Sequence, residues 1–410
     1  AILDYSDHGF WALRDAVIAA YALAAFLAPA LWRQMAPASD SRAPDLSTLV
    51  ARVLLPVSLL AAFWAAAFHF DLFGLRGLSG TKADFLSMSA LIAAWVCALA
   101  ALRIRISTHA GSLAAWAAAL LCLLLVMQLP TRTVWLATAP LAMLALAACC
   151  GTPARRKVLW SGALLASVAG IVLGVKVGGT FGEFKNQYGL DRELNFSLDE
   201  IEKHPDRGTA APLLPQRQND AAPVRAAGNS GAPKSETIER LQSLLNPDED
   251  QFTTDQGKRG ADAARWRAVF WMRCYYYTLE RAPLTGLGFG NNLTLLLRNT
   301  AAWPRYIESQ KLDPPNRSPH NAHVTIFTRL GFLGLALWLG ILGSAFVSAL
   351  KSCWRAQVSD DRAAFYTRLS ALGVWLIFVW TMSFGVVLEG PFGGIWFWAL
   401  TGVLAKLDQN

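Results

Sequence analysis

The chain has 410 residues, of which 54% are hydrophobic and only 16% are charged, and its formal net charge is +8 at pH 7. Soluble domains rarely carry so large an apolar excess, so the composition excludes an ordinary soluble protein and indicates a membrane protein. The positive charge does not indicate a nucleic-acid partner, because it is spread over short connections between apolar runs instead of forming one basic face.

Apolar runs of about 18 residues or more, enough to cross a hydrocarbon core of about 30 Å, recur along the chain. They are rich in Leu, Ala, Val and Trp with isolated glycines, as bilayer helices are. We therefore predict an all-α polytopic integral membrane protein. Because the chain begins at Ala1 and not at a methionine, we also expect that a segment precedes it. The predicted crossings are residues 10–32, 49–70, 84–102, 112–129, 133–150, 158–178, 320–350, 364–384 and 391–406.

Basic residues mark one side of this predicted bundle. They lie in connections that fall on alternate sides of the membrane, and the positive-inside rule makes those connections cytoplasmic. The long segment 180–318 then lies on the outer side, and its 18 basic and 18 acidic residues leave it neutral. The basic residues of the cytoplasmic connections are Arg33, Arg42, Arg52, Arg103, Arg105, Arg155, Arg156, Lys157, Lys351, Arg355, Arg362 and Arg368.

The outer segment is not uniform in composition. Residues 205–235 are rich in Pro, Ala, Gly and Asn, and we expect this piece to be mobile. Residues 235–246 have helical periodicity, and residues 260–290 predict an amphipathic helix that ends at Pro283 and is followed by a glycine-rich turn. The predicted domains are N-terminal transmembrane helices at 1–179, one large outer loop at 180–319 and C-terminal transmembrane helices at 320–410.

Two histidines, His320 and His323, open one predicted crossing directly after a proline. At a spacing of three they share a helix face, and Gly331 and Gly334 fall close to that face, where small residues let a neighbouring helix approach. Arg329 lies on the opposite side of this predicted helix. An imidazole can accept a proton near neutral pH, so His320 is a candidate general base. The alternative is a pair of interfacial histidines hydrated by lipid headgroups.

Arginines on the outer side are candidates for phosphate binding, because a guanidinium is always charged and binds phosphate oxygens in a bidentate manner. Arg132 lies at the outer end of two predicted crossings, although it could instead be a snorkelling residue. Arg267 and Arg265 lie on the predicted amphipathic helix, where the alternative is a solvated interfacial charge. We expect Arg273 and Arg281 of the same helix to be surface charges.

Three further features could contribute to a site. Gly286, Gly288 and Gly290 either offer backbone amides to a phosphate or simply permit a tight turn, and we favour the turn. Glu389, at the outer end of two crossings, is a functional candidate because ionisable groups there are costly, or else it is a simple loop carboxylate. Asn321 could bond the helix terminus or an acceptor sugar.

Several of these residues have the order and spacing of one known family. His320-Asn321, nine residues, Gly331, two residues and Gly334 resemble the H-[NSQ]-x9-G-x-x-[GTY] pattern of the O-antigen ligase and polymerase family. The resemblance covers roughly residues 120–340, and the N-terminal third matches only as generic bilayer helices. Other elements similar to that family are TRTVW at 131–135, RLQSL at 240–244, RAVFW at 267–271 and PLTGLGFG at 283–290.

The resemblance implies a GT-C-like glycosyltransferase in a Gram-negative inner membrane, with its active site facing the periplasm. Such enzymes move a glycan from undecaprenyl pyrophosphate to a sugar hydroxyl, and the ligases move it to lipid A-core. On this resemblance His320 is the catalytic base, and Arg132 and Arg267 bind the pyrophosphate, with Arg265 as the alternative to Arg267. The residues expected beside the site or in acceptor binding are Asn321, His323, Glu389 and Gly288.

We expect no cofactor and no metal, because arginines can supply the positive charge that a divalent cation supplies elsewhere, and we expect inversion by direct displacement. Within the family we favour a ligase over a polymerase, because the sequence shows one large outer loop and not two. We favour it over a protein O-oligosaccharyltransferase, because the large C-terminal additions common there are absent. A transporter of polyprenol-linked glycans is the alternative from another class, but it would need more charges within the crossings.

Overall fold

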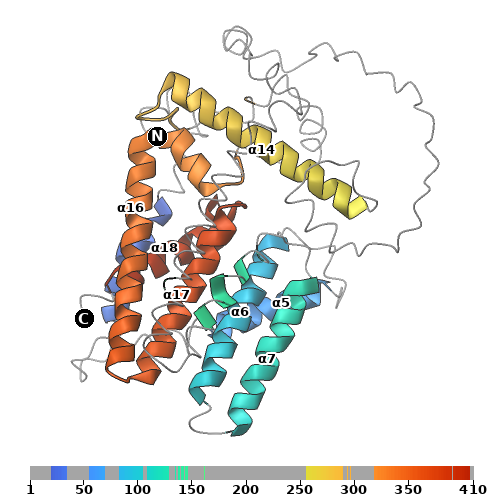
Figure 1. Cartoon of the computed structure of the whole chain (residues 1–410), viewed down its shortest axis with the longest axis vertical. Helices are drawn as coiled ribbons and strands as arrows, with labels where there is room; N and C mark the ends of the chain where they lie inside the picture. Colours follow the sequence, from blue (N-terminus) through green and yellow to red (C-terminus); the bar gives the residue numbers. More distant parts are fainter. Residues whose placement is uncertain are drawn as a thin grey trace, which may run out of the picture. The chain divides into compact units, whose positions relative to one another are not determined.

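The computed structural model describes residues 20–34, 55–69, 83–104, 109–128, 255–289, 318–389 and 391–406, and isolated positions at 134, 137–138, 140–142, 144–145, 161, 293 and 296. Every element within these residues is helical, which confirms the all-α prediction for this part of the chain (Figure 1). The elements are α3 (Leu23–Gln34), α5 (Leu55–His69), α6 (Ala83–Ile104), α7 (His109–Gln128), α14 (Asp255–Arg281), α16 (Ala322–Val358), α17 (Arg362–Met382), the 3-10 helix η5 (Val387–Glu389) and α18 (Pro391–Lys406).

Apolar length sets which described helices can cross a bilayer. Three qualify by length and composition: Phe85–Leu102 within α6, Ala322–Val358 and Arg362–Met382. In α7 the apolar stretch Ser112–Met127 is shorter. The membrane-helix character predicted from the sequence is thus confirmed for these elements.

The remaining predicted segments differ in how far the structure describes them. The predicted crossings 49–70 and 391–406 contain α5 and α18, and part of 10–32 forms α3. The crossing 158–178 lies outside the described residues except for one position, as does much of 133–150. The predicted helix at 235–246 and the segment 205–235 lie wholly outside them.

The chain forms two compact units. The first comprises Ala1–Val175, Tyr275–Asn291 and Ser318–Asn410, and the second comprises Lys176–Cys274 and Asn292–Arg317. The end of α14 and the turn after it therefore belong with the transmembrane helices, although they lie within the predicted outer loop at 180–319.

Helix α14 ends as its sequence predicts. It runs to Arg281, the amide of Ala282 still donates to the carbonyl of Thr278 at 3.0 Å, and Pro283 has no amide hydrogen with which to continue the helix. The turn that follows places Gly286 at φ 73° and Gly288 at φ 77°, values that glycine adopts without steric cost. An amphipathic helix followed by a glycine turn is confirmed.

Helix α16 departs from the single straight helix predicted at 320–350. Its backbone leaves helical geometry at Gly331, where φ is 64° and ψ is −160°. Two arms result, residues 322–330 and 332–358, and Figure 1 shows them in lighter and darker orange at a sharp angle to each other. The predicted helix face shared by His320, Gly331 and Gly334 therefore does not exist, because helical periodicity cannot be counted across the break.

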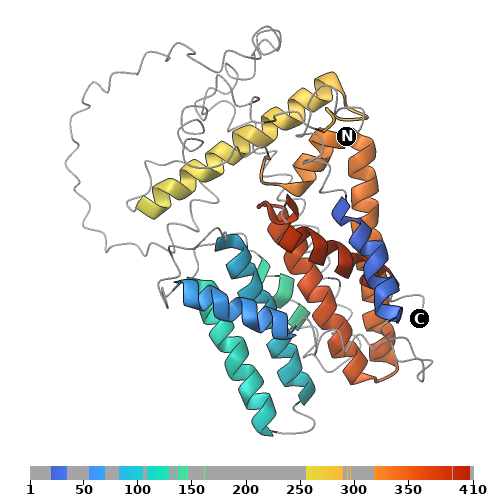
Figure 2. The same cartoon turned by 180° about the vertical axis from the view of Figure 1, so that it is seen from behind.

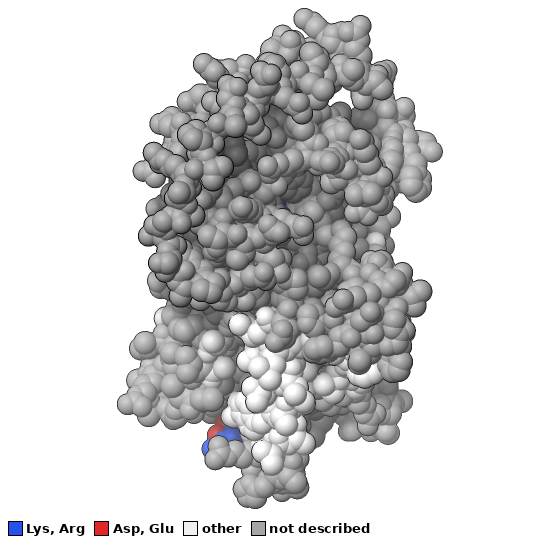
Figure 3. All heavy atoms as spheres, turned by 90° about the vertical axis from the view of Figure 1, so that its right-hand side faces the viewer, with Lys and Arg blue, Asp and Glu red and all other residues white. Residues whose placement is uncertain are grey.

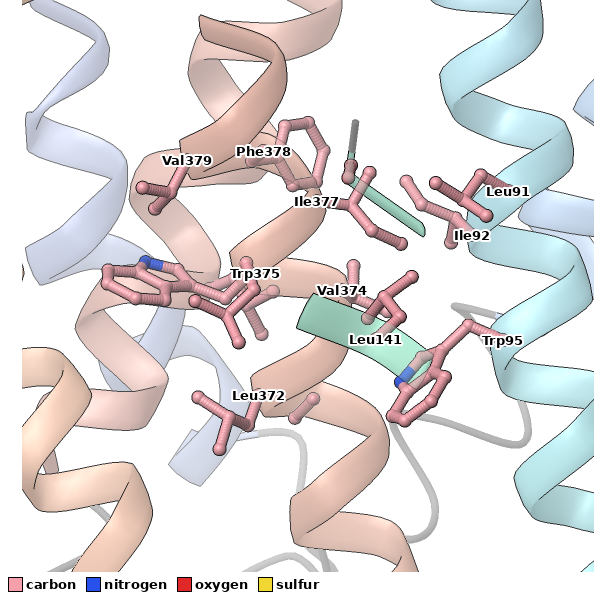
Figure 4. Close-up of a cluster of buried hydrophobic side chains, with 14 of the residues drawn as sticks. Leu91, Ile92, Trp95, Leu141, Leu372, Val374, Trp375, Ile377, Phe378 and Val379 are labelled. Carbon is pink, nitrogen blue, oxygen red and sulfur yellow. The ribbon is translucent and has the colours of Figure 1, made fainter. Parts of the chain in front are cut away.

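Helix α17 is the centre of the core of the first unit. On one side, Val374 and Ile377 point toward Leu91 and Trp95 of α6 (Figure 4). The Trp95 indole donates to the carbonyl of Ser370 at 3.2 Å. This approach requires a small residue on α17, because a Cβ at Gly373 would overlap the Trp95 ring.

On another side, α17 packs on α18. The indole of Trp375 donates to Thr401 Oγ1 at 2.9 Å and stacks on Phe397 with ring centroids 6.4 Å apart. Helix α18 in turn packs against α3, the blue helix in Figure 2. The approach is close because Gly402 lies against the backbone of Ala25. The first unit is therefore a bundle built by close helix-to-helix contacts at small residues.

The outward side of the bundle is apolar. Helix α7 exposes Leu113 at 72% and Leu121 at 67% of their surfaces. On the face displayed in Figure 3 the described atoms belong almost entirely to uncharged residues, with charged atoms at one end. Exposed leucines without charges suit contact with lipid tails.

Candidate functional site

The residue before the first turn of α16 has an unusual backbone. His320 has φ 57°, and among the described residues other than glycine only Asp360 shares a positive φ. Such a conformation costs about 1–3 kcal/mol for a residue with a Cβ, so the surroundings must hold it in place. The side chain of His320 is half-buried.

Asn321 provides the helix cap that follows His320. Its Oδ1 accepts the backbone amides of His323 at 3.0 Å and Val324 at 3.1 Å. Asn321 has extended backbone angles, φ −149° and ψ 114°, as an N-cap residue has. The cap is made by Asn321, so the imidazole of His320 is not needed to close the helix end.

A second set of hydrogen bonds holds the backbone of His320. The His320 amide donates to Ser318 Oγ at 3.2 Å, and the Thr325 hydroxyl donates to the Asn321 carbonyl at 2.9 Å. Ser318 Oγ and Thr325 Oγ1 lie 3.5 Å apart. Because the Thr325 proton is already committed, the Ser318 hydroxyl is the donor between these two. Ser318 and Thr325, which the sequence analysis did not single out, thus close the loop around His320.

The ring of His323 makes hydrogen bonds at both nitrogens. Its Nδ1 is 2.9 Å from Trp338 Nε1, and its Nε2 is 3.0 Å from Ser383 Oγ at the end of α17. Trp338 and Ser383 are also residues that the sequence analysis missed. No local pattern marks them, since they are 15 and 60 positions away from His323.

The glycine turn after α14 fills the break in α16. The amides of Phe332 and Leu333 donate to the carbonyls of Pro283 at 2.8 Å and Leu284 at 3.2 Å. The amides of Leu287 and Gly288 return bonds to the carbonyls of Thr328 and Arg329, at 2.8 and 3.0 Å. Backbone groups left without helical partners by the break therefore find partners in the turn.

Two glycines permit this contact. A Cβ at Gly286 would overlap the backbone of Arg329 and Leu330, and a Cβ at Gly331 would overlap the backbone of Pro283 and Leu284. Both also have positive φ. Gly286 and Gly331 are 45 positions apart in sequence, yet both lie at the same contact between the turn and the break in α16.

Gly288 and Arg329 interact in both directions. Besides the amide bond already given, Arg329 Nη1 donates to the Gly288 carbonyl at 3.1 Å. Arg329 is buried, with 5% of its surface exposed. The amide of Gly286 also donates to a backbone carbonyl, that of Ala282, at 2.8 Å. All three backbone amides at 286–288 therefore donate to carbonyl groups of the protein itself. These contacts favour the structural interpretation of Gly286 and Gly288 over phosphate binding, while Gly290 lies outside the described residues.

Of the three predicted arginines, the structure describes the side chain of Arg267 alone. Arg267 is half-buried on α14 and belongs to the second unit, whereas His320 belongs to the first. Arg265 lies on α14, but its side chain, like that of Glu389 at the end of η5, is outside the described residues, and so is Arg132 altogether. One expectation is wrong: Arg273 is buried at 7% exposure and is not a surface charge, because it lies on the apolar side of the amphipathic helix. Arg281 is exposed, as expected.

Within the described residues no group of three or more His, Cys, Asp or Glu side chains could hold a metal ion. Asp248-Glu249-Asp250, an Asp-x-Asp triplet of the kind that holds divalent cations in some glycosyltransferases, lies outside them. Metal independence therefore stays a prediction.

Comparison with known protein families finds a match. A family model described as O-antigen ligase matches residues 116–339, more than half of the chain. The matched range includes the glycine turn, His320, Asn321, His323, the break at Gly331 and Trp338. No curated protein matches the chain.

Proposed function

Because the chain belongs to the O-antigen ligase family of glycosyl-transferring membrane enzymes, we propose that it is itself an O-antigen ligase. It would take O-antigen glycan from undecaprenyl pyrophosphate and attach it to a sugar hydroxyl of lipid A-core. The proposal places it in a Gram-negative inner membrane, as a GT-C-like enzyme with its site on the periplasmic side.

His320 is the proposed general base, and its backbone is the observation that carries the proposal. A sugar hydroxyl is a poor nucleophile, so a base must take its proton as the new bond forms. His320 is kept in a costly left-handed conformation by Ser318 and sits directly ahead of a cap made by another residue. Strain held in place by surrounding hydrogen bonds is typical of functional positions.

Arg132 and Arg267, with Arg265 as the alternative to Arg267, are the proposed pyrophosphate ligands. The leaving pyrophosphate gains negative charge as the glycosidic bond breaks, and fixed guanidinium groups stabilise that charge. Since these arginines supply the positive charge, the proposed reaction needs no metal and proceeds by direct displacement with inversion at the anomeric carbon. Glu389 remains a candidate partner for one of these cations. If Asn321 contacts the acceptor, it does so through its Nδ2 group, because its Oδ1 is engaged in the cap.

The test is glycan transfer by purified protein, supplied with undecaprenyl-pyrophosphate-linked O-antigen and lipid A-core, without ATP and with EDTA. We expect wild type to form product, His320→Ala to lose about 10²- to 10⁴-fold in rate, and Arg267→Ala to lose about 10²-fold or more. Arg281→Ala, an exposed arginine on the same helix, is the matched control and should keep full activity.

Other outcomes identify other functions. Chain extension on undecaprenyl pyrophosphate without lipid A-core would indicate a polymerase, and transfer to a protein hydroxyl would indicate a protein O-oligosaccharyltransferase. A protein that moves the lipid-linked glycan across vesicles but forms no covalent product would be a transporter. Activity that requires Mg²⁺ or Mn²⁺ would contradict the arginine-based mechanism.

A further inference from the structure

The ring of His323 connects three segments of the first unit. His323 lies on the first arm of α16, eight residues before Gly331, and Trp338 lies on the second arm, seven residues after it. Ser383 is the cap residue at the end of α17. The imidazole on the first arm therefore bonds to the second arm through Trp338 and to α17 through Ser383.

The partners determine where the proton of this imidazole sits. An indole nitrogen can only donate, so Trp338 Nε1 donates to His323 Nδ1, which must be unprotonated. The Ser383 hydroxyl donates to the carbonyl of Val379 at 2.8 Å, so toward His323 it acts as the acceptor, and His323 Nε2 carries the hydrogen. The ring is thus neutral, with its hydrogen on Nε2.

Trp338 is itself fixed from the far side. It is buried at 4% exposure and contacts Phe397 and Trp398 of α18, with ring centroids 5.7 and 5.5 Å away. Through Trp338, the ring of His323 thereby links the first arm of α16 to α18, and through Ser383 it links the same arm to α17. At the other end of the arms, the glycine turn holds the break at Gly331. The first arm is therefore held at both of its ends.

We propose that His323 is a positioning residue for the base His320, and not a second base. The proposal rests on the proposed function of His320. Both ring nitrogens of His323 are engaged, so it has no lone pair with which to accept a proton from a substrate. Without the His323 bonds, an arm about 12 Å long could pivot at Gly331 and carry His320 with it. A displacement of about 1 Å at a reacting group can lower a rate about 10²-fold.

The first experiment removes each bond singly and measures kcat and KM for donor and acceptor. Trp338→Phe keeps an aromatic ring but loses the N–H, and Ser383→Ala loses the hydroxyl. We expect each to lower kcat about tenfold or more with KM nearly unchanged, while the amount of folded protein and its melting temperature stay close to wild type. Trp396→Phe, on an exposed indole of α18, is the matched control and should leave kcat unchanged.

Conservative variants at His323 separate positioning from proton transfer. His323→Asn keeps an acceptor near the Nδ1 position, and His323→Gln keeps an N–H near the Nε2 position, while His323→Phe keeps neither. Neither amide can act as a base, so partial rescue by Asn or Gln relative to Phe supports positioning. Amide variants as inactive as His323→Phe, together with full activity in Trp338→Phe and Ser383→Ala, would overturn the proposal in favour of a base.

A direct readout separates this inference from the proposed function. In protein with ¹⁵N-labelled histidine, one ring should show a protonated Nε2 and a bare Nδ1, and that signal should vanish in His323→Gln. The opposite tautomer, or a doubly protonated ring at neutral pH, would overturn the inference even if transfer is observed. If wild type forms no glycan product in any assay, the function of the site fails, while the expected tautomer would still verify the link between the arms.

Discussion

At the scale of single residues, the mouth of α16 combines strain with a strong cap. His320 holds a left-handed backbone that costs free energy, and Asn321 immediately after it satisfies two amides of the first helical turn. The two features depend on each other, because the cap fixes the direction in which the chain enters the helix. Asn321 is therefore expected to affect both the stability of the helix end and the orientation of His320.

Replacing Asn321 tests this coupling. Asn321→Ala removes the acceptor for two backbone amides and should destabilise the fold by about 0.5–2 kcal/mol, with a larger proportional loss of transfer rate because His320 loses its fixed orientation. Asn321→Asp keeps an acceptor at the same place and should retain most of the stability. Thermal unfolding in detergent, measured beside the transfer assay, gives both quantities.

The N-cap of α17 offers a control for the effect of losing a helix cap on overall stability. Asp361 accepts the amide of Ala364 at 2.9 Å and begins a helix of similar apolar character. Asp361→Ala should therefore lower the melting temperature by a similar amount while leaving transfer unchanged. Equal losses of activity in both cap variants would mean that Asn321 acts only through global stability.

At the scale of elements, the helix α16 was predictable from the sequence, but its break at Gly331 was not. The apolar run and the glycine-rich turn after α14 were predicted, with Gly286 assigned to that turn and Gly331 to a helix face that a neighbouring helix could approach. Periodicity assumes an unbroken ladder of helical hydrogen bonds, however, and so placed Gly331 on the face of a straight helix. The break is stable only because the turn at 283–288, distant in sequence, supplies the missing donors and acceptors. A single helix considered alone cannot reveal such a partner.

Alanine substitutions at the two glycines should confirm this contact. Gly331→Ala and Gly286→Ala each place a Cβ against backbone that cannot move aside and in a left-handed conformation, so each should destabilise the first unit by roughly 2 kcal/mol or more. Gly343→Ala, where nothing lies within 4 Å of an added Cβ, is the control on the same helix. It should keep wild-type stability or gain up to about 1 kcal/mol. The melting temperatures of the three variants measure these changes in stability. A Gly331→Ala variant as stable as wild type would contradict the described break.

At the scale of the whole molecule, composition predicted the class and the helices, while the site residues divided into two groups. His320 and Asn321 were predicted as candidates because residue type and position at a helix start carry chemical meaning. Trp338, Ser383 and Ser318 were missed, because tryptophan and serine are common in apolar helices and their role exists only through contacts between segments. The predicted sidedness of the membrane rests on charge distribution alone, and it decides whether His320 could meet the proposed periplasmic donor.

Cysteine labelling tests that sidedness. The connection between α16 and α17 is flanked by Lys351, Arg355 and Arg362, so the positive-inside rule predicts that it is cytoplasmic. Val358→Cys, at a position 71% exposed, should react with a membrane-impermeant maleimide only after the cells are permeabilised. Ser230→Cys, in the segment 180–318, should react in intact spheroplasts. The described native cysteines Cys97, Cys122, Cys274 and Cys353 are buried, and labelling of wild type measures the background from the other two, Cys149 and Cys150. Reversed labelling would put His320 on the cytoplasmic side, where the proposed transfer to lipid A-core could not occur.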